Sequence, residues 1–236
     1  MVPQDSLLFS RSIGGNIAYG KPEAGMELII EAAETSQIRR DIERFPDQFD
    51  TVVGERGMTL SGGQKQRVNL ARALAASPEV LLCDEVISAL DSIVGANVIE
   101  LLKRLRKQTG VSFVFISHDL STVASFADEI VVLYAGRVVE QGPADHVLSP
   151  PYHPYTRLLI SSVPELRVGW LEETMQTQEA QAGIDRVVTL TEVGCPFFDR
   201  CPLAIKDTCD RETPPVRQLN GGHTIECHRS EAEFLQ

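Results

Sequence analysis

The fold of this protein is decided by an octet, Leu60-Ser61-Gly62-Gly63-Gln64-Lys65-Gln66-Arg67, that opens a run with helical spacing from 64 to 76. The octet places a hydroxyl and two glycines directly before the predicted helix. Free backbone N–H groups and the positive end of the helix dipole attract a phosphate at such a position. Ser-Gly-Gly alone would also serve as an ordinary N-cap with flexible glycines. The complete octet, followed by a strand that ends in acids, favours the phosphate-binding interpretation.

An apolar run follows the helix at 80–83 and ends in two acidic residues, Asp84 and Glu85. A short apolar run of this kind predicts a buried parallel strand. One of two adjacent acids can bind a metal ion while the other, which points elsewhere, accepts a proton. We therefore expect chemistry at this strand end rather than a solvated acidic loop.

Strands and helices alternate through most of the chain. Helices are expected at 23–43, 64–76, 94–108 and 120–127, and strands at 80–83, 112–117, 129–133 and 137–141. Residues 1–21 are expected to be irregular, and 23–43 to form a helical subdomain. The alternation predicts an α/β fold with a parallel sheet closed by a hairpin at Ala135-Gly136. The tail is rich in prolines and loops, which predicts two domains, 1–149 and 150–236.

Composition and charge exclude several classes of protein. With 236 residues, of which 43% are hydrophobic, the chain can bury a sizeable core, which excludes a disordered protein. Its 33 acidic against 22 basic residues argue against electrostatic binding of nucleic acid or anionic lipid. No run approaches the ~20 apolar residues of a membrane span, and the start lacks a secretion signal. We therefore expect a cytoplasmic protein that reaches a membrane only through other proteins.

The octet resembles the signature motif of the ATP-binding subunits of ABC transporters, and residues 80–85 resemble their Walker B strand. The resemblance implies an ATPase core of the P-loop NTPase type that uses ATP and Mg²⁺. Within it, Asp84 would hold Mg²⁺ and Glu85 would polarise the attacking water. The motif residues that would contact the nucleotide are Ser61, Gly62, Gly63 and Gln64.

Three further positions match the family in their order along the chain. Asp91 ends a Ser-Ala-Leu-Asp stretch that is similar to the D-loop, which implies a place at the nucleotide. His118 resembles the switch histidine that contacts the γ-phosphate. Gln4 resembles the Q-loop glutamine, which reaches the metal and the transmembrane partner. Val86 and Ile87 stand where family members often carry Pro-Thr, a departure that leaves both acids in place.

The phosphate-wrapping Walker A loop of the family, Gly-x-x-x-x-Gly-Lys-Ser/Thr, has no counterpart upstream of the Q-loop in this sequence. A near-match from Gly15 to Lys21 lacks the hydroxyl, because Pro22 follows it, and no apolar strand precedes it. We interpret the chain as the C-terminal part of an ABC ATPase that is inactive in isolation. Because family members pair head to tail, a second ATPase subunit would bring ATP to this signature motif. Permease subunits would hold the pair at the inner face of the membrane.

The tail carries a second resemblance. Residues 136–143 and 153–159 resemble the end of the ATPase subunits of oligopeptide and dipeptide importers. Four cysteines resemble the extension of these subunits that can hold a [4Fe-4S] cluster: Cys195, Cys201, Cys209 and Cys227. Their place in the last fifth of the chain favours a metal site in a reducing compartment, with iron–sulfur, zinc or free thiols all open. Cys83, within the predicted strand, is expected to serve packing.

The first part of the chain resembles a different type of ABC ATPase. Residues 4–9 and 45–57 are more similar to exporter ATPases than to peptide importers. The extended tail carries more weight, so the predicted function is an ATP-binding and ATP-hydrolysing subunit for oligopeptide or dipeptide import. Two alternatives stay open: a non-enzymatic, metal-bearing interaction module, and the ATPase part of an ABC exporter.

Overall fold

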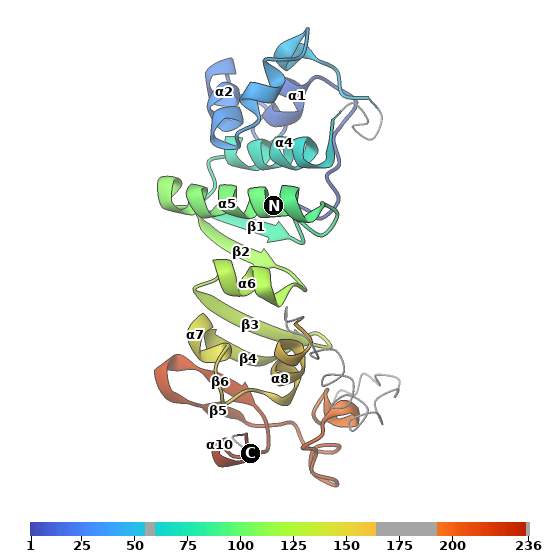
Figure 1. Ribbon diagram of the computed structural model, residues 1–236, viewed down its shortest axis with the longest axis vertical. Helices are drawn as coiled ribbons and strands as arrows, with labels where there is room; N and C mark the ends of the chain where they lie inside the picture. The colour runs from blue at the N-terminus through green and yellow to red at the C-terminus, as the bar shows by residue number, and fades with distance from the viewer. Residues whose placement is uncertain (55–59, 164–192, 235–236) are drawn as a thin grey trace, which may run out of the picture. The chain divides into compact units, whose positions relative to one another are not determined.

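The computed structural model describes residues 1–54, 60–163 and 193–234, so the end of the exporter-like stretch at 45–57 lies outside the described residues. Contacts divide the chain into two compact units, Met1–Asp119 and Leu120–Gln236 (Figure 1). This division falls earlier in the chain than the boundary predicted between 149 and 150. Compact units and family domains are defined differently, and the domains at 1–149 and 150–236 stay a prediction.

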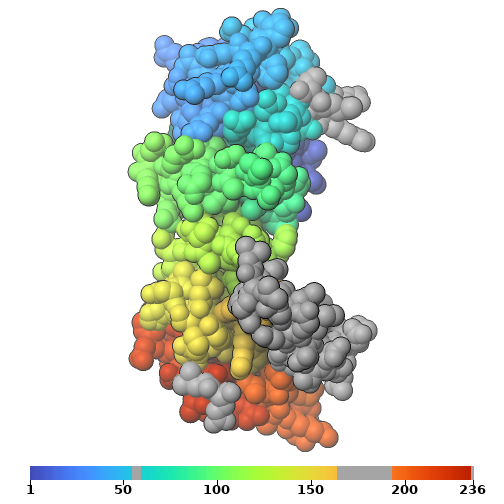
Figure 2. Space-filling view, in the orientation of Figure 1, coloured from blue at the N-terminus to red at the C-terminus, as the bar shows by residue number. Residues whose placement is uncertain are grey.

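Unit 1 contains most of the predicted helices and strands. Its elements are α1 (Ile13–Ala18), α2 (Met26–Thr35), α3 (Arg39–Ile42), the 3-10 helix η1 (Gln48–Asp50), α4 (Gly62–Ala75), β1 (Val80–Asp84), α5 (Ser92–Thr109) and β2 (Ser112–Ile116). The helices predicted at 64–76 and 94–108 and the strands at 80–83 and 112–117 are confirmed, with small differences at their ends. Helices α2 and α5 both reach the surface of this unit (Figure 2).

Strands β1 and β2 lie parallel, with Val80 opposite Ser112 and Asp84 opposite Ile116. Val2 extends this pairing on the other edge of β1. Its N–H donates to Leu82 O at 2.7 Å, and the N–H of Asp84 donates to Val2 O at 3.0 Å. Three parallel segments therefore end side by side, which brings the residues that follow each of them to one edge.

The predicted helical subdomain packs on α4. Its core contains buried apolar side chains from α1, α2, α3 and α4, among them Ile13, Ile17, Ala33, Ile42 and Val68. The single helix predicted at 23–43 is wrong, because α2 and α3 are separated at Gln37, whose φ is 58°. This left-handed conformation turns the chain out of the helix. The Gln37 carbonyl accepts a hydrogen bond from Arg67 Nη1 at 2.9 Å, which fixes the break against α4.

The start of the chain, predicted to be irregular, contains α1. Ser12 caps this helix, since the N–H of Gly15 donates to Ser12 Oγ at 3.1 Å. Asn16 is completely buried, and its side chain bonds to the main chain of Phe9 through both the N–H (2.8 Å) and the carbonyl (3.0 Å). These bonds satisfy the main-chain polar groups of Phe9 in the loop before α1. Hydrophobic periodicity gives no sign of them in the sequence.

Unit 2 contains a four-stranded antiparallel sheet in the order β3-β4-β6-β5. Its elements are α6 (Leu120–Phe126), β3 (Glu129–Tyr134), β4 (Arg137–Pro143), α7 (Ala144–Val147), α8 (Pro154–Ser161), η3 (Phe198–Arg200), β5 (Val216–Gln218), η4 (Asn220–Gly222), β6 (Thr224–Glu226) and α10 (Glu231–Phe234). The predicted hairpin is confirmed. Its turn has positive φ at both Ala135 (50°) and Gly136 (78°), as a two-residue type I′ turn requires.

The hairpin pairs with other strands than expected. Among the described residues no ladder joins it to β1 and β2; β4 instead pairs with β6 of the tail, with Glu140 opposite Ile225. Glu140 is buried, and its Oε1 lies 2.7 Å from Nε2 of His223, which precedes β6. This buried polar contact helps to hold β6 beside β4, and the tail therefore contains more regular structure than its composition predicts.

Candidate active site

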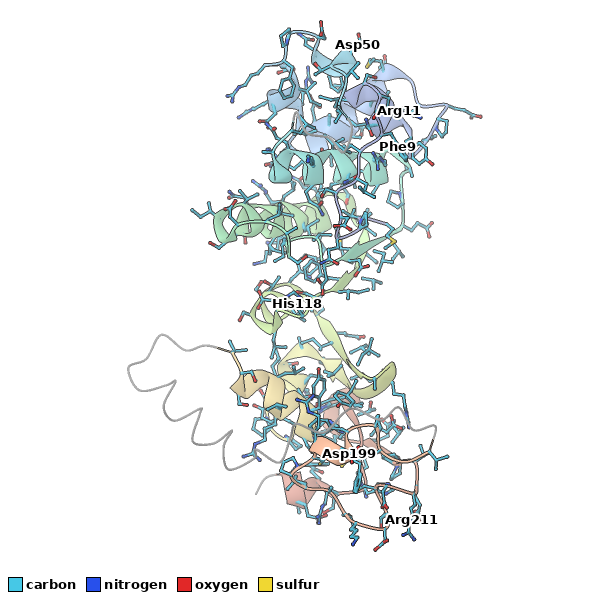
Figure 3. The ribbon with its side chains drawn as sticks, turned by 90° about the vertical axis from the view of Figure 1, so that its right-hand side faces the viewer. Phe9, Arg11, Asp50, His118, Asp199 and Arg211 are labelled. Atoms are coloured by element: carbon cyan, nitrogen blue, oxygen red, sulfur yellow. The ribbon has the colours of Figure 1, made fainter. Side chains whose placement is uncertain are left out.

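The carboxyl end of β1 places Glu85 beside His118. The N–H of Glu85 donates to Ile116 O of β2 at 2.9 Å, and His118 Nδ1 lies 3.0 Å from Glu85 Oε1. Glu85 has a φ of 45°, and its carbonyl accepts a hydrogen bond from Ser88 Oγ at 2.9 Å. His118 follows β2 and is largely exposed (Figure 3). The parallel strands thus bring together two residues that the sequence assigned to catalysis.

Asp84 and Gln4 lie near the same edge. Asp84 is the last residue of β1 and is half-buried, and Gln4 follows Val2, the residue that is bonded to β1. Carboxylate oxygens are the ligands that Mg²⁺ prefers in proteins. The donor chemistry at the end of β1 therefore fits the metal ion that the sequence predicts for Asp84.

The signature octet begins α4 with a complete capping box. The N–H of Gln64 donates to Ser61 Oγ at 3.3 Å, while the N–H of Ser61 donates to Gln64 Oε1 at 3.0 Å. Ser61 and Gly62, at the start of this helix, are exposed to solvent. The first N–H groups of α4 and the Ser61 hydroxyl can donate hydrogen bonds to an anion.

The glycines of the octet also have a packing role. A Cβ atom at Gly63 would lie 2.7 Å from Val94 Cγ1, and one at Gly62 would lie 3.1 Å from Leu90 Cδ2. Val94 is in α5, which is capped by Asp91 through a hydrogen bond from the N–H of Val94 to Asp91 Oδ1 at 3.0 Å. The start of α4 and the predicted D-loop are therefore neighbours, and side chains larger than glycine would separate them.

The near-match to a phosphate loop, from Gly15 to Lys21, does not form a loop around an open space. Its residues up to Ala18 belong to α1. Asn16 is completely buried, and its side chain is bonded to the main chain of Phe9. No strand of the described residues leads into it. The structure therefore agrees with its exclusion as a Walker A loop.

The four tail cysteines are neighbours in unit 2. Cys195 N–H donates to Cys209 O at 2.7 Å, and burial raises the pKa of Cys195 to about 11 and that of Cys201 to about 12. Burial also raises the pKa of Cys227, and charge on the neighbouring thiols raises all three values further. Within the described residues, however, no three His, Cys, Asp or Glu side chains are arranged as the ligands of a metal ion. The donors are gathered and chemically suitable, while the geometry of a metal centre is not formed.

Cys83 differs from these four. It is fully buried within β1, and burial raises the pKa of its thiol to about 12. An inert, protonated thiol in a strand fits the predicted packing role.

Two family models match the chain. Residues 1–88 match the family described as ABC transporter, and residues 139–209 match the oligopeptide/dipeptide transporter C-terminal region. The chain belongs to the ABC transporter ATP-binding family. The first matched segment of this ABC chain includes Gln4, the signature octet and both acids, while Asp91 and His118 follow it.

Two relatives of this ABC chain have names that refer to peptide transport. A Brucella abortus protein whose name describes a peptide import ATP-binding protein is 38% identical over 92% of this chain and 58% of its own length. A Bacillus subtilis protein named for oligopeptide transport is 34% identical, over 89% of this chain and 60% of its own. The chain therefore spans a little over half the length of these relatives.

A solved structure extends the likeness to the fold. A bacterial Atm1-family ABC exporter with ATP bound has a TM-score of 0.54 and 38% sequence identity, covering 75% of this chain and 28% of its own. None of the helices in the described part of the ABC chain combines the length and apolar character of a membrane span.

The sequence did not indicate one residue that contacts the signature motif. Asp41 of α3 accepts a hydrogen bond from Gln64 Nε2 at 3.0 Å. It lies in a short polar stretch well before the octet, and no motif or periodicity marks it. Only the packing of α3 against α4 reveals this contact.

Proposed function

We propose that this chain provides the signature face of an ATP-binding subunit that powers oligopeptide or dipeptide import through an ABC transporter. The observation that carries the proposal is the order of the two family matches in one chain, an ABC transporter segment followed by the C-terminal region of oligopeptide/dipeptide transporters. The names of the relatives agree with it.

Each motif residue of the chain has a proposed role in binding or hydrolysing ATP. Ser61 and the free N–H groups of α4 bind the γ-phosphate of an ATP that a partner subunit holds. His118 fixes the Glu85 carboxylate through their 3.0 Å contact. Glu85 would orient the attacking water and accept its proton at an ATP bound beside β1, a position for which this sequence supplies no phosphate-wrapping loop. Asp84 would hold Mg²⁺, an ion that would neutralise charge on the phosphates.

The proposed partners follow from these roles, because this chain supplies the signature motif and another subunit must hold the ATP. A second, complete ATP-binding subunit pairs head to tail with the chain and brings the phosphate-wrapping loop, and permease subunits hold the pair at the cytoplasmic face of the membrane. Without a partner the chain does not hydrolyse ATP, because phosphoryl transfer depends on positioning the β- and γ-phosphates.

The test mixes the purified chain with the complete Bacillus subtilis relative, whose own signature serine is replaced by arginine. Only a composite site that contains the signature motif of this chain can then turn over. We expect Mg²⁺-ATP hydrolysis from the mixture and none from either protein alone. Hydrolysis by this chain alone, or a silent mixture of folded proteins, would overturn the proposal.

A second candidate function concerns the tail. We propose that Cys195, Cys201, Cys209 and Cys227 hold a [4Fe-4S] cluster, with a single Zn²⁺ as the alternative. The proposal is supported by four thiols that come from loops, three of which (Cys195, Cys201 and Cys227) have a pKa that is raised by burial and further by the neighbouring thiols. Thiolates are soft ligands that suit both iron–sulfur clusters and zinc. Iron, sulfide and zinc analysis of the anaerobically purified chain separates the two, and a chain with none of them would refute both.

A further inference from the structure

Asp41 connects the short helix α3 to the signature motif. Its Oδ1 accepts a hydrogen bond from Gln64 Nε2 at 3.0 Å, and its Oδ2 lies 3.1 Å from Arg67 Nη1. The side chains of Asp41 and Arg67 are 22% and 29% exposed, so this contact is partly shielded from solvent. Both carboxylate oxygens therefore hold side chains from the first two turns of α4.

The contact with Asp41 determines the orientation of the Gln64 amide. A carboxylate can only accept, so the NH₂ group of Gln64 must face Asp41 and its Oε1 must face the other way. There Oε1 accepts the N–H of Ser61 at 3.0 Å. Asp41 thus fixes one side of the capping box from outside the helix.

The capping box in turn prepares the Ser61 hydroxyl. Ser61 Oγ accepts the N–H of Gln64 at 3.3 Å, which occupies one of its lone pairs. A hydroxyl has a single proton to donate. With its oxygen already used as an acceptor, Ser61 keeps this proton for an acceptor outside the helix, such as a phosphate oxygen.

The neighbouring arginine supports the same geometry. Arg67 Nε donates to Gly63 O at 3.3 Å and Nη1 donates to Gln37 O at 2.9 Å. Arg67 therefore links Asp41 to the main chain of the octet and to the break between α2 and α3. This network orients the start of α4 relative to the helical subdomain.

We propose that Asp41 is a positioning residue for nucleotide engagement, acting through Gln64 on Ser61. The inference rests on the proposed function, because it assumes that Ser61 meets the ATP held by a partner. Asp41 itself does not touch the nucleotide. Its effect is to restrict the Gln64 side chain to the one orientation that supports the Ser61 N–H.

The test uses the same mixture with the Bacillus subtilis relative and compares Asp41→Ala, Asp41→Asn and Glu43→Gln. Asp41→Ala should raise the half-saturating concentration of Mg²⁺-ATP by roughly three- to tenfold, the effect of losing one ordinary hydrogen bond. Asp41→Asn keeps an oxygen for Gln64 and should restore most of the affinity. Glu43 directly follows α3 and bonds to Arg39 rather than to α4, so Glu43→Gln should leave the value unchanged.

The half-saturating concentration of Mg²⁺-ATP distinguishes a positioning role of Asp41 from an effect on the stability of the fold. A variant that only folds less well lowers the maximal rate and leaves the half-saturating concentration unchanged. A double variant, Asp41→Ala with Gln64→Ala, should be no worse than Gln64→Ala alone, because both act on one chain of contacts. Multiplied effects, or an Asp41→Ala variant with wild-type affinity, would refute the inference.

A second readout does not need the partner. In the free chain, Asp41→Ala should speed amide hydrogen exchange at Ser61, while Glu43→Gln should not. If the wild-type mixture is silent, the proposed function fails, and exchange alone then decides the role of Asp41. Unchanged exchange at Ser61 would show that Gln64 is held without Asp41.

Discussion

Glu85 combines an unfavourable backbone conformation with a specific contact. A non-glycine residue with a φ of 45° costs about 1 kcal/mol or more, and such residues persist where the surrounding structure fixes them. Here the N–H is bonded to β2 and the carbonyl to Ser88, while the carboxylate meets His118. In this conformation the Glu85 carboxylate lies against His118, the other residue that the sequence assigned to catalysis.

Replacing Glu85 by glutamine tests this role. Glu85→Gln keeps the size of the side chain and removes its basicity. The ATP that meets Ser61 in the mixture is held by the complete partner, which carries its own Walker B acids, so turnover should stay within about twofold of the wild-type value, far from the ~100-fold that loss of a general base costs. The unfolding midpoint in urea should stay unchanged. Glu79→Gln is the matched control, because Glu79 is exposed directly before β1. A loss of ~100-fold would show instead that Glu85 acts on the ATP at the signature motif.

His153 is a second residue whose environment has measurable consequences. It is 1% exposed, caps α8 by accepting the N–H of Tyr155 at Nδ1 (3.1 Å), and burial lowers its pKa to about 4. Its main-chain N–H donates to the buried Glu140. The imidazole is therefore neutral at pH 7 in the folded protein.

The sign of the pH effect follows from this depressed pKa. Between pH 6.5 and about 4 the unfolded chain takes up a proton at His153 and the folded chain does not, so acidification destabilises the fold. The loss is at most about 3 kcal/mol over this range. Burial raises the pKa of Glu140, which opposes the trend, since the folded state then takes up the proton first.

Comparison with His153→Asn isolates the histidine. Asparagine keeps an N-cap acceptor for Tyr155 and does not titrate. Between pH 6.5 and 4, hydrogen exchange of α8 should accelerate more in the wild type than in the variant at the same pH. The contribution of Glu140 is common to both proteins to a first approximation. Parallel pH dependences would show that His153 is protonated in the fold.

At the scale of elements, α4 holds the start of the chain through Arg72. Its guanidinium donates to Asn16 O (2.9 Å), Asn16 Oδ1 (2.8 Å) and Leu7 O (3.2 Å). It also lies 5.2 Å from the ring centre of Phe9 and 5.8 Å from that of Tyr19. Burial lowers the pKa of Arg72, although the group stays charged. Figure 3 shows Phe9 together with Arg11 in this part of unit 1.

Arg72→Ala should therefore destabilise unit 1 by roughly 2–4 kcal/mol, because it removes three charged hydrogen bonds and leaves the buried Asn16 without a partner for Oδ1 other than Phe9. Arg39→Ala is the control. Arg39 pairs with Glu34 and Glu43 on the surface, where solvent screens ion pairs and leaves them little effect on stability. Urea unfolding followed by circular dichroism measures both. Equal losses would show that the bonds of Arg72 add nothing beyond a surface pair.

Local sequence signals predicted the elements that have strong periodicity. The apolar run that becomes β1 and the periodic run that becomes α4 depend on neighbouring residues, and both were predicted to within two residues at their ends. The break at Gln37 was missed, because it is a glutamine in a left-handed conformation that usually favours glycine or asparagine. It is stabilised by Arg67, which lies in another helix.

At the scale of the whole molecule, the pairing of distant segments could not be predicted. β4 and β6 are far apart in sequence, and β6 is only Thr224–Glu226, too short for a periodic pattern. The contact between Glu140 and His223 joins the same two regions and has no local signal. The candidate site was more predictable, since a family motif marks Ser61, Asp84, Glu85 and His118, whereas Asp41 has no such mark.

The last prediction concerns the tail as a part of unit 2. Metal binding would supply folding free energy to the loops around the four cysteines, because the ligands must be gathered and deprotonated before the metal can bind. Arg137 already ties these loops to β4: its Nη1 donates to Gly194 O at 3.0 Å, and its Nη2 pairs with Glu226 at 2.6 Å. Each of these two residues precedes a cysteine. Without metal, the thiols of Cys195, Cys201 and Cys227 stay protonated at neutral pH, since burial raises their pKa values.

Anaerobically purified chain should accordingly be brown and contain about four irons, as a [4Fe-4S] cluster does. Serine in place of any one of Cys195, Cys201, Cys209 or Cys227 should remove the colour and accelerate hydrogen exchange at 195–201 and 224–227. Exchange in α4 and β1 should stay unchanged, because these elements belong to unit 1. Cys83→Ser is the control and should keep the colour. A colourless chain with one zinc would assign the cysteines to Zn²⁺, and a chain whose exchange is indifferent to both metals would leave the tail held by Arg137 and the sheet alone.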